Sequence, residues 1–255
     1  MSWIEVVILF VSGTLAGIIN TVVGSGSLIT FPVLLALGYP PVLANVTNNV
    51  GVFPGGISGA IAYRKELKGQ LKPVLALATF SAIGGLAGAL LLLQLPAEVF
   101  GSVVPALIVL ALLLVVFGPW IKRTIAARRI DRGDTEVPRN RVALFTTTAL
   151  TGVYGGYFGA AQGVILLSSL SILLPGSLQR ANAYKNVLAA TANGAAAIVF
   201  VLISQVAWLA AGVIAIGAIL GGQIGGWVGQ RLPPLVLRIV IVVVGLAAIA
   251  YFIVN

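Results

Sequence analysis

The chain has 255 residues, of which 59% are hydrophobic and 8% are charged, and its formal net charge is +9. Soluble domains are about 25% charged, so the composition excludes an ordinary soluble protein and predicts an all-α, polytopic membrane protein. The chain has no histidine and no cysteine, which excludes a Ser-His-Asp hydrolase, disulfides and thiolate metal sites. Without a Walker A motif either, we expect no enzyme and no cofactor.

Apolar runs follow one another along the chain, and each predicts a helix. The runs are 4–22, 24–38, 41–63, 73–94, 99–121, 142–160, 163–174, 178–203, 206–229 and 234–254. Crossing a membrane takes roughly 20 helical residues, a length that most runs reach. The runs 24–38 and 163–174 are shorter, and the sequence leaves open whether they cross the membrane or re-enter it.

The second half of the chain repeats the first at one fixed offset. Gly84 to Gly88 recurs as Gly221 to Gly225, and Ala44 to Val50 aligns with Ala181 to Val187. Apolar internal repeats are typical of secondary transporters, whose substrate site lies where the repeats meet. Five runs in each repeat predict that the two are inverted. We therefore expect a first repeat at 1–121, a linker at 122–141 and a second repeat at 142–255.

The basic residues lie in connections that would share one side of the membrane. They are Arg64, Lys65, Lys68 and Lys72 after the third run, seven residues in the linker 122–141, and Arg180, Arg231 and Arg238. By the positive-inside rule this side is cytoplasmic, and both termini are outside. Topology thus explains the positive charge, and no nucleic acid partner is needed. A regulatory or anionic-lipid role of the basic linker is the alternative.

Glycine clusters precede both short runs and predict a broken backbone within the membrane. The first is Gly24-Ser25-Gly26-Ser27, and the second extends from Gly155 through Gln162 to Gly163. A helix that begins near the midplane offers unpaired N–H groups and a positive dipole end to an anion. Ser25, Ser27 and Gln162 would add donors. The alternative is that these glycines only permit close helix packing, which is the interpretation we favour for Gly84 and Gly88.

The third run of each repeat carries a polar cluster. Thr47, Asn48 and Asn49 align with Tyr184, Lys185 and Asn186. Polar side chains at this depth are costly and normally face a cavity or a partner helix, so substrate binding and interhelical hydrogen bonding are the two interpretations. Lys185 would attract an anion or would snorkel to the cytoplasmic surface. The six acidic residues lie at run ends or in loops, which disfavours cation transport.

At these residues the chain resembles the sulfite exporter family of the TauE/SafE type. The residues that carry the resemblance are Gly17, Gly24 to Leu28, Pro32, Gly38, Ala44, Thr47 and Asn48, with a degenerate copy at Gly152, Gly156, Gly159, Gly163 and Ala181. The resemblance implies an inner-membrane permease of two homologous halves that moves sulfite or small organic sulfur-containing anions outward. The chain departs from the family pattern at 160–162 and 184–186.

We therefore expect a transporter, surrounded by membrane lipids, that exports sulfite or a small sulfonate by alternating access. An anion channel with the same fold and a membrane scaffold subunit acting through the linker are the alternatives. The residues expected to bind the anion are Gly24, Ser25, Gly26, Ser27, Thr47, Asn48, Asn49, Gln162, Gly163, Lys185 and Asn186. We expect no metal site. The oligomeric state, a homo-oligomer included, is left open.

Overall fold

The computed structural model describes residues 1–131 and 140–228, together with 239, 242–243 and 246, and the fold is all-helical. The helices are α1 (Trp3–Val22), α2 (Ser27–Ala36), α3 (Pro41–Ala62), the 3-10 helix η1 (Arg64–Leu67), α4 (Leu71–Gln94), α5 (Ala97–Asp131), α6 (Arg141–Tyr157), α7 (Gln162–Leu173), α8 (Leu178–Ile203) and α9 (Trp208–Val228). Within these ranges, five helices are long and apolar enough to cross a membrane, namely α1, α4, α5, α8 and α9. The composition therefore predicted the fold class correctly.

The first nine predicted runs agree with the helices to within a few residues, apart from the end of α5. Both short runs are short helices, α2 and α7, and the backbone is broken before each of them. Helix α5 continues to Asp131, so the predicted linker 122–141 begins as helix, because 122–131 contains neither glycine nor proline. The predicted run 234–254 lies outside the described residues, except for four positions.

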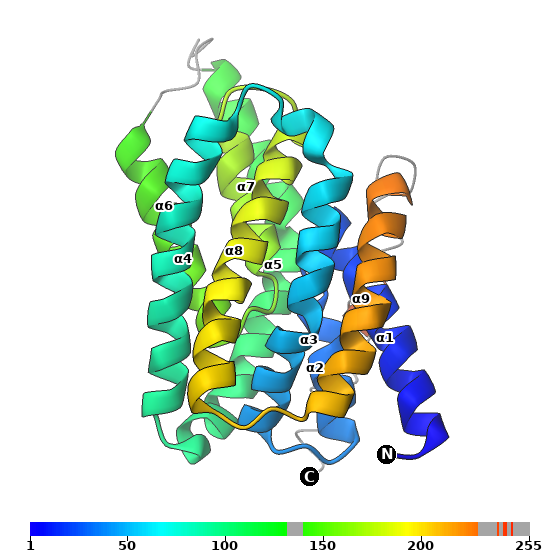
Figure 1. The fold of residues 1–255 in the computed structure, drawn as a ribbon. Coiled ribbons are helices and arrows are strands. Elements are labelled where there is room, and N and C mark those ends of the chain that lie inside the picture. Colours follow the sequence, from blue (N-terminus) through cyan, green and yellow to red (C-terminus); the bar gives the residue numbers. More distant parts are fainter. Residues whose placement is uncertain (132–139, 229–238, 240–241, 244–245, 247–255) are drawn as a thin grey trace.

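The helices form one bundle whose connections lie at two opposite ends (Figure 1). The α3–α4 and α7–α8 connections lie at one end, and the N-terminus with the α4–α5 and α8–α9 connections lies at the other. Helix α2 occupies the half of the bundle near the N-terminus, whereas α7 occupies the opposite half (Figure 1). The two broken segments therefore approach the centre of the bundle from opposite ends.

The fourth helix of each half packs against helices of the other half, so α4 and α9 are exchanged between the halves. Helix α4 packs against α6 and α8, and α9 packs against α1 and α3. The repeated glycines form these contacts: a Cβ atom at Gly84 would overlap the backbone of Ala149 in α6, and one at Gly221 would overlap that of Thr14 in α1. Small residues let helix backbones approach closely in lipid. The packing role expected of Gly84 is confirmed.

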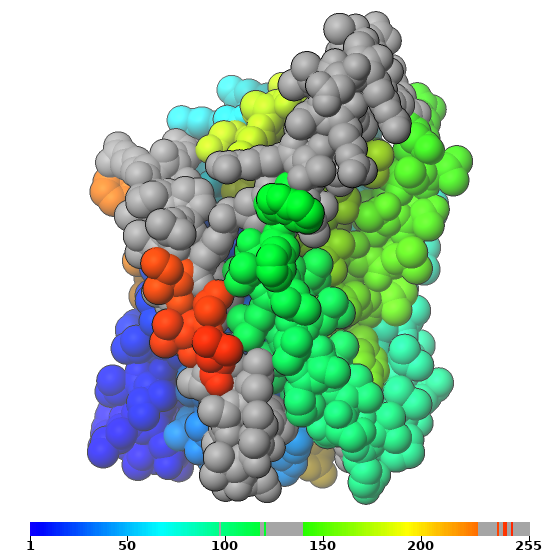
Figure 2. Space-filling view, turned by 180° about the vertical axis from the view of Figure 1, so that it is seen from behind, coloured from blue at the N-terminus to red at the C-terminus, as the bar shows by residue number. Residues whose placement is uncertain are grey.

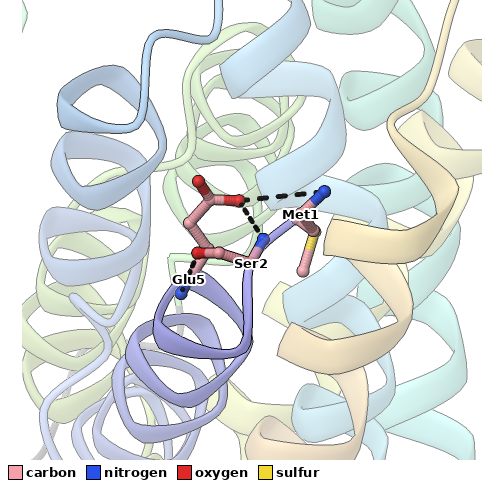
Figure 3. A network of polar contacts seen from close by, with 3 residues as sticks. All are labelled: Met1, Ser2 and Glu5. Atoms are coloured by element: carbon pink, nitrogen blue, oxygen red, sulfur yellow. Dashed lines mark hydrogen bonds and ion pairs between the residues drawn. The ribbon is translucent and has the colours of Figure 1, made fainter.

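The start of α1 is fixed by a capping box (Figure 3). The backbone N–H of Glu5 donates to Ser2 Oγ at 3.3 Å, and the backbone N–H of Ser2 donates to Glu5 Oε2 at 2.9 Å. The N-terminal ammonium lies 4.0 Å from the same carboxylate oxygen. These contacts satisfy N–H groups that the first turn of a helix leaves unpaired, and the carboxylate complements the helix dipole.

The outer surface of the bundle is apolar, as expected of a surface in contact with lipid. On α5, Phe100, Val104 and Ile108 are fully buried, while Leu110, Leu113 and other apolar side chains are exposed. Figure 2 shows this face, across which α5 extends as a green column. A helix that is apolar all round fits the interior of a membrane rather than a water-facing surface. The chain is a multi-pass membrane protein.

The glycine contacts generate a stability prediction. Gly221→Ala should lower the free energy of unfolding by about 1–3 kcal/mol, because a Cβ atom must displace packed backbone. Gly212→Ala is the matched control in the same helix, since nothing lies within 4 Å of its Cβ position. Thermal unfolding of the detergent-solubilised protein measures both. Equal melting temperatures for the two variants would contradict this account of the exchanged helices.

Candidate functional site

The two glycine breaks touch each other at the centre of the bundle. The backbone N–H of Gly163 donates to the carbonyl oxygen of Gly24 at 2.9 Å. A Cβ atom at either glycine would overlap the Cα atom of the other. The contact joins the start of α7 to the segment between α1 and α2, so the first and second halves of the chain meet here through their backbones.

Left-handed backbone conformations create both breaks. Gly24 has a φ of +93° after the end of α1, and Gly159 has a φ of +78° after the end of α6. Ala161, just before α7, has a φ of +60°, a conformation that costs an L-residue about 1–2 kcal/mol. The hydroxyl of Tyr154 donates to the carbonyl oxygen of Ala160 at 2.7 Å and holds this segment against α6.

The carbonyl groups at the end of α1 are bound by side chains of α8. Lys185 Nζ donates to the carbonyl oxygens of Asn20 at 2.7 Å and Thr21 at 3.0 Å. Asn182 and Asn186 donate through Nδ2 to the same Thr21 oxygen at 3.2 and 3.3 Å. Lys185 is 1% exposed, so it does not snorkel to the surface. Its ammonium lies at the negative end of the α1 dipole.

The end of α6 has a corresponding partner on α3. Asn45 Nδ2 donates to the carbonyl oxygen of Tyr157, the last residue of α6, at 2.9 Å. Asn45 and Asn182 align at the repeat offset, and neither was among the predicted site residues. The occurrence of asparagine at both aligned positions is the sequence signal that would have identified them. In each half, the third helix thus binds the broken end of the other half's first helix.

Two other predicted residues on α3 form interhelical hydrogen bonds. Thr47 Oγ1 accepts from the backbone N–H of Ala207, just before α9, at 3.1 Å. Asn48 Oδ1 accepts from the hydroxyl of Thr30 in α2. Tyr184, which aligns with Thr47, donates from its hydroxyl to Gln70 Oε1 at 2.9 Å, just before α4. These contacts are those that the interhelical interpretation of the polar clusters expects.

Several buried polar atoms have no hydrogen-bond partner within the described part of the chain. They are Thr21 Oγ1, Ser25 Oγ, Asn49 Oδ1, Gln162 Nε2, Arg180 Nε, Asn182 Oδ1 and Asn193 Oδ1. Buried polar groups are nearly always paired, so each unpaired group requires an explanation. Ser25 follows Gly24 and Gln162 precedes Gly163, so two of these residues flank the contact between the breaks. Neither the Ser25 hydroxyl nor Gln162 Nε2 has a hydrogen-bond partner among the described residues, and the Gln162 amide lies against Gly155 of α6.

The remaining predicted residues lie around the same contact. The backbone N–H of Gly26 donates to Asn20 Oδ1 at 2.9 Å, and a Cβ atom there would overlap the backbone of Ala16. Ser27 is buried at the first position of α2. Among the described residues, no three histidine, cysteine, aspartate or glutamate side chains are grouped so that they could hold a metal ion.

Comparison with known proteins identifies the family. The sequence matches the family described as sulfite exporter TauE/SafE over residues 9–252. A probable membrane transporter protein of Haemophilus influenzae is 29% identical over 86% of this chain and 82% of its own length. The probable membrane transporter protein ORF9 of a Sinorhizobium species is 29% identical over 94% and 88%, and the probable membrane transporter protein YfcA of Escherichia coli is 28% identical over 86% and 78%.

No solved structure matches the chain. The family match extends from α1 to residue 252 and includes both breaks, the exchanged helices and the polar residues that bind the broken helix ends. The protein therefore belongs to the sulfite exporter TauE/SafE family.

Proposed function

We propose that this protein exports sulfite or a small sulfonate across the inner membrane by alternating access. The observation that carries the proposal is the backbone contact between Gly24 and Gly163, with the unpartnered side chains of Ser25 and Gln162 beside it. Substrate sites of transporters with internal repeats lie where broken helices of the two repeats meet. Residues at this contact are therefore the proposed binding site.

The chemistry of the contact favours an anion. The Ser25 hydroxyl and the Gln162 amide nitrogen are donors, and α2 and α7 begin beside them with the positive ends of their dipoles. Lys185 uses two of the three N–H donors of its ammonium for the carbonyls of α1. The third donor and the positive charge remain to attract an oxyanion. Sulfite and sulfonates present the charged oxygen acceptors that such donors bind.

The contact also favours alternating access over a permanent pore. Ser25 is 1% exposed and Gln162 is 2% exposed, and the backbones between them touch. An anion can reach these donors only when the breaks move apart. Such a movement changes which hydrogen bonds connect the two halves, whereas a permanently open channel requires no such change.

We further propose that the basic end of the bundle faces the cytoplasm and that the N-terminus is outside. Among the described side chains, the basic residues other than Lys185 lie near connections at one end: Arg64, Lys65, Lys68, Lys72, Arg141 and Arg180. Glu5 and Glu98 lie at the other end. Basic connections stay on the cytoplasmic side during membrane insertion.

Cysteine labelling tests the orientation, since the natural chain has no cysteine. Lys68→Cys in the α3–α4 connection should react with a membrane-impermeant maleimide only after permeabilisation. Gln205→Cys in the α8–α9 connection should react in intact cells. Both positions are exposed. The opposite labelling pattern would reverse the proposed orientation.

Removing the unpartnered donors tests the substrate site. Ser25→Ala and Gln162→Met should each weaken the apparent affinity for sulfite or sulfoacetate about tenfold or more, because a hydrogen bond to a charged group contributes about 1.5–3 kcal/mol. Uptake of these anions into inside-out vesicles measures the effect. Ser102→Ala is the control, since that exposed hydroxyl donates to the carbonyl of Val99 within its own helix. Wild-type transport in both test variants would refute the site.

Lys185 has a separate test, because its ammonium binds the end of α1 and is also proposed to attract the anion. Lys185→Gln should raise the KM for the exported anion at least tenfold and lower the melting temperature. Lys185→Arg should keep both the KM and the melting temperature closer to the wild-type values. Lys72→Gln, an exposed charge at the basic end, is the control for net charge. If Lys185→Gln lowered only the melting temperature, Lys185 would hold α1 without contributing to anion binding.

A further inference from the structure

A polar cavity lies at the basic end of the bundle. It has a volume of about 540 Å³ and is formed by the starts of α4, α6 and α8 and the end of α7. The polar residues that line it are Gln70, Asn140, Arg141, Arg180 and Tyr184. Helix α4 packs against α6 and α8, and α7 packs against the same two helices. Arg141 and Pro175 are exposed, so the cavity opens to the surface at this end of the bundle.

The charged side chains described in this cavity are both arginines. Arg141 and Arg180 line it, and no aspartate or glutamate among the described residues does. Among the described residues, neither arginine has a carboxylate within ion-pair distance. The Nε atom of Arg180 is buried and has no hydrogen-bond partner there. Buried polar groups without partners are rare, so this nitrogen points to a solute that the cavity takes up.

The other polar groups of the cavity are already engaged in the fold. Tyr184 donates to Gln70 Oε1, and Asn140 Oδ1 accepts from the backbone N–H of Ala143 as the cap of α6. These bonds use the amide oxygens of Gln70 and Asn140, so the donors that remain are their amide N–H groups and the two guanidinium groups, which alone are charged. Helices α6 and α8 begin at this cavity with their positive dipole ends, and α7 ends there with a negative one. Two full charges outweigh that partial charge of about half a unit.

We propose that this cavity binds an oxyanion group through Arg180 and Arg141 and is a first binding site for the exported anion. The identity of the ligand rests on the proposed function, whereas the site itself does not. A guanidinium presents a planar fork of donors that matches a sulfonate, sulfite or phosphate group. Tyr184 lies in the cavity and Lys185 follows it on α8, so one helix connects this cavity to the glycine breaks.

Direct binding tests the inference in the full chain. The background carries Ser25→Ala and Gln162→Met, which removes the donors of the central contact. The rise of the melting temperature with sulfite or sulfoacetate concentration gives an apparent Kd. Arg180→Gln and Arg141→Gln should each raise this Kd at least tenfold, and Arg180→Lys should raise it less. Lys68→Gln, an exposed charge outside the cavity, should leave it unchanged.

A lipid phosphate shares the chemistry of these anions, so a second arm identifies the source. Wild type and Arg180→Gln are compared in vesicles of phosphatidylcholine with and without phosphatidylglycerol. Stabilisation by phosphatidylglycerol that requires Arg180, without an arginine-dependent Kd for soluble anions, would identify a lipid headgroup as the ligand. That result would overturn the proposal that the cavity is a first binding site for the exported anion. The absence of any arginine-dependent effect, from soluble anion or lipid, would overturn the oxyanion site.

Transport separates this inference from the proposed function. If the wild type moves none of the sulfur anions while arginine-dependent binding persists, the proposed function fails and the oxyanion site stands. If sulfite export proceeds and both arginine variants bind and transport like the wild type, the proposed function stands and the cavity is not a binding site. Arginine variants whose melting temperature without anion matches the wild type provide the comparison, because their fold is intact.

Discussion

The backbone contact between Gly24 and Gly163 is the constraint on which the rest of the structure depends. Two helices are interrupted at this contact, and hydrocarbon supplies no hydrogen bonds for the groups that an interruption exposes. The protein itself must bind them. Lys185, Asn182 and Asn186 bind the end of α1, and Asn45 binds the end of α6. These four polar residues of the third helices therefore satisfy carbonyl groups that the breaks expose.

The packing of α4 and α9 joins the two halves of the chain. Because α9 packs against α1 and α3, and α4 against α6 and α8, neither half of the chain forms a separate body. The glycines that recur at the repeat offset occupy corresponding contacts: Gly85 lies against Ala192 in α8, and Gly222 lies against Gly55 in α3. The same backbone spacing is thus imposed twice. Any movement that separates the breaks has to slide or tilt helices along these closely packed surfaces.

The sequence predicted the helices and the breaks well, because long apolar runs and glycine clusters determine both through local chemistry. It identified Thr47, Asn48 and Lys185 as unusual but could not show their partners, since Ala207, Thr30 and the end of α1 are distant in the chain. In the sequence, Arg180 indicates only membrane topology. The burial of its Nε atom depends on how α8 packs and cannot be predicted from the sequence. The continuation of α5 past residue 121 is not predicted by hydropathy, because the charged residues after 121 end the apolar run while remaining compatible with a helix.

The two broken helix ends are held with unequal strength. At α1, one ammonium and two amides bind the last carbonyls, whereas at α6 a single amide of Asn45 does so. Hydrogen bonds from charged donors are stronger than those from neutral ones. A movement that released α1 would break four side-chain hydrogen bonds from α8, whereas one that released α6 would break a single one from α3. Two similar halves of one chain thus hold their broken helices differently, and one lysine supplies two of the additional hydrogen bonds.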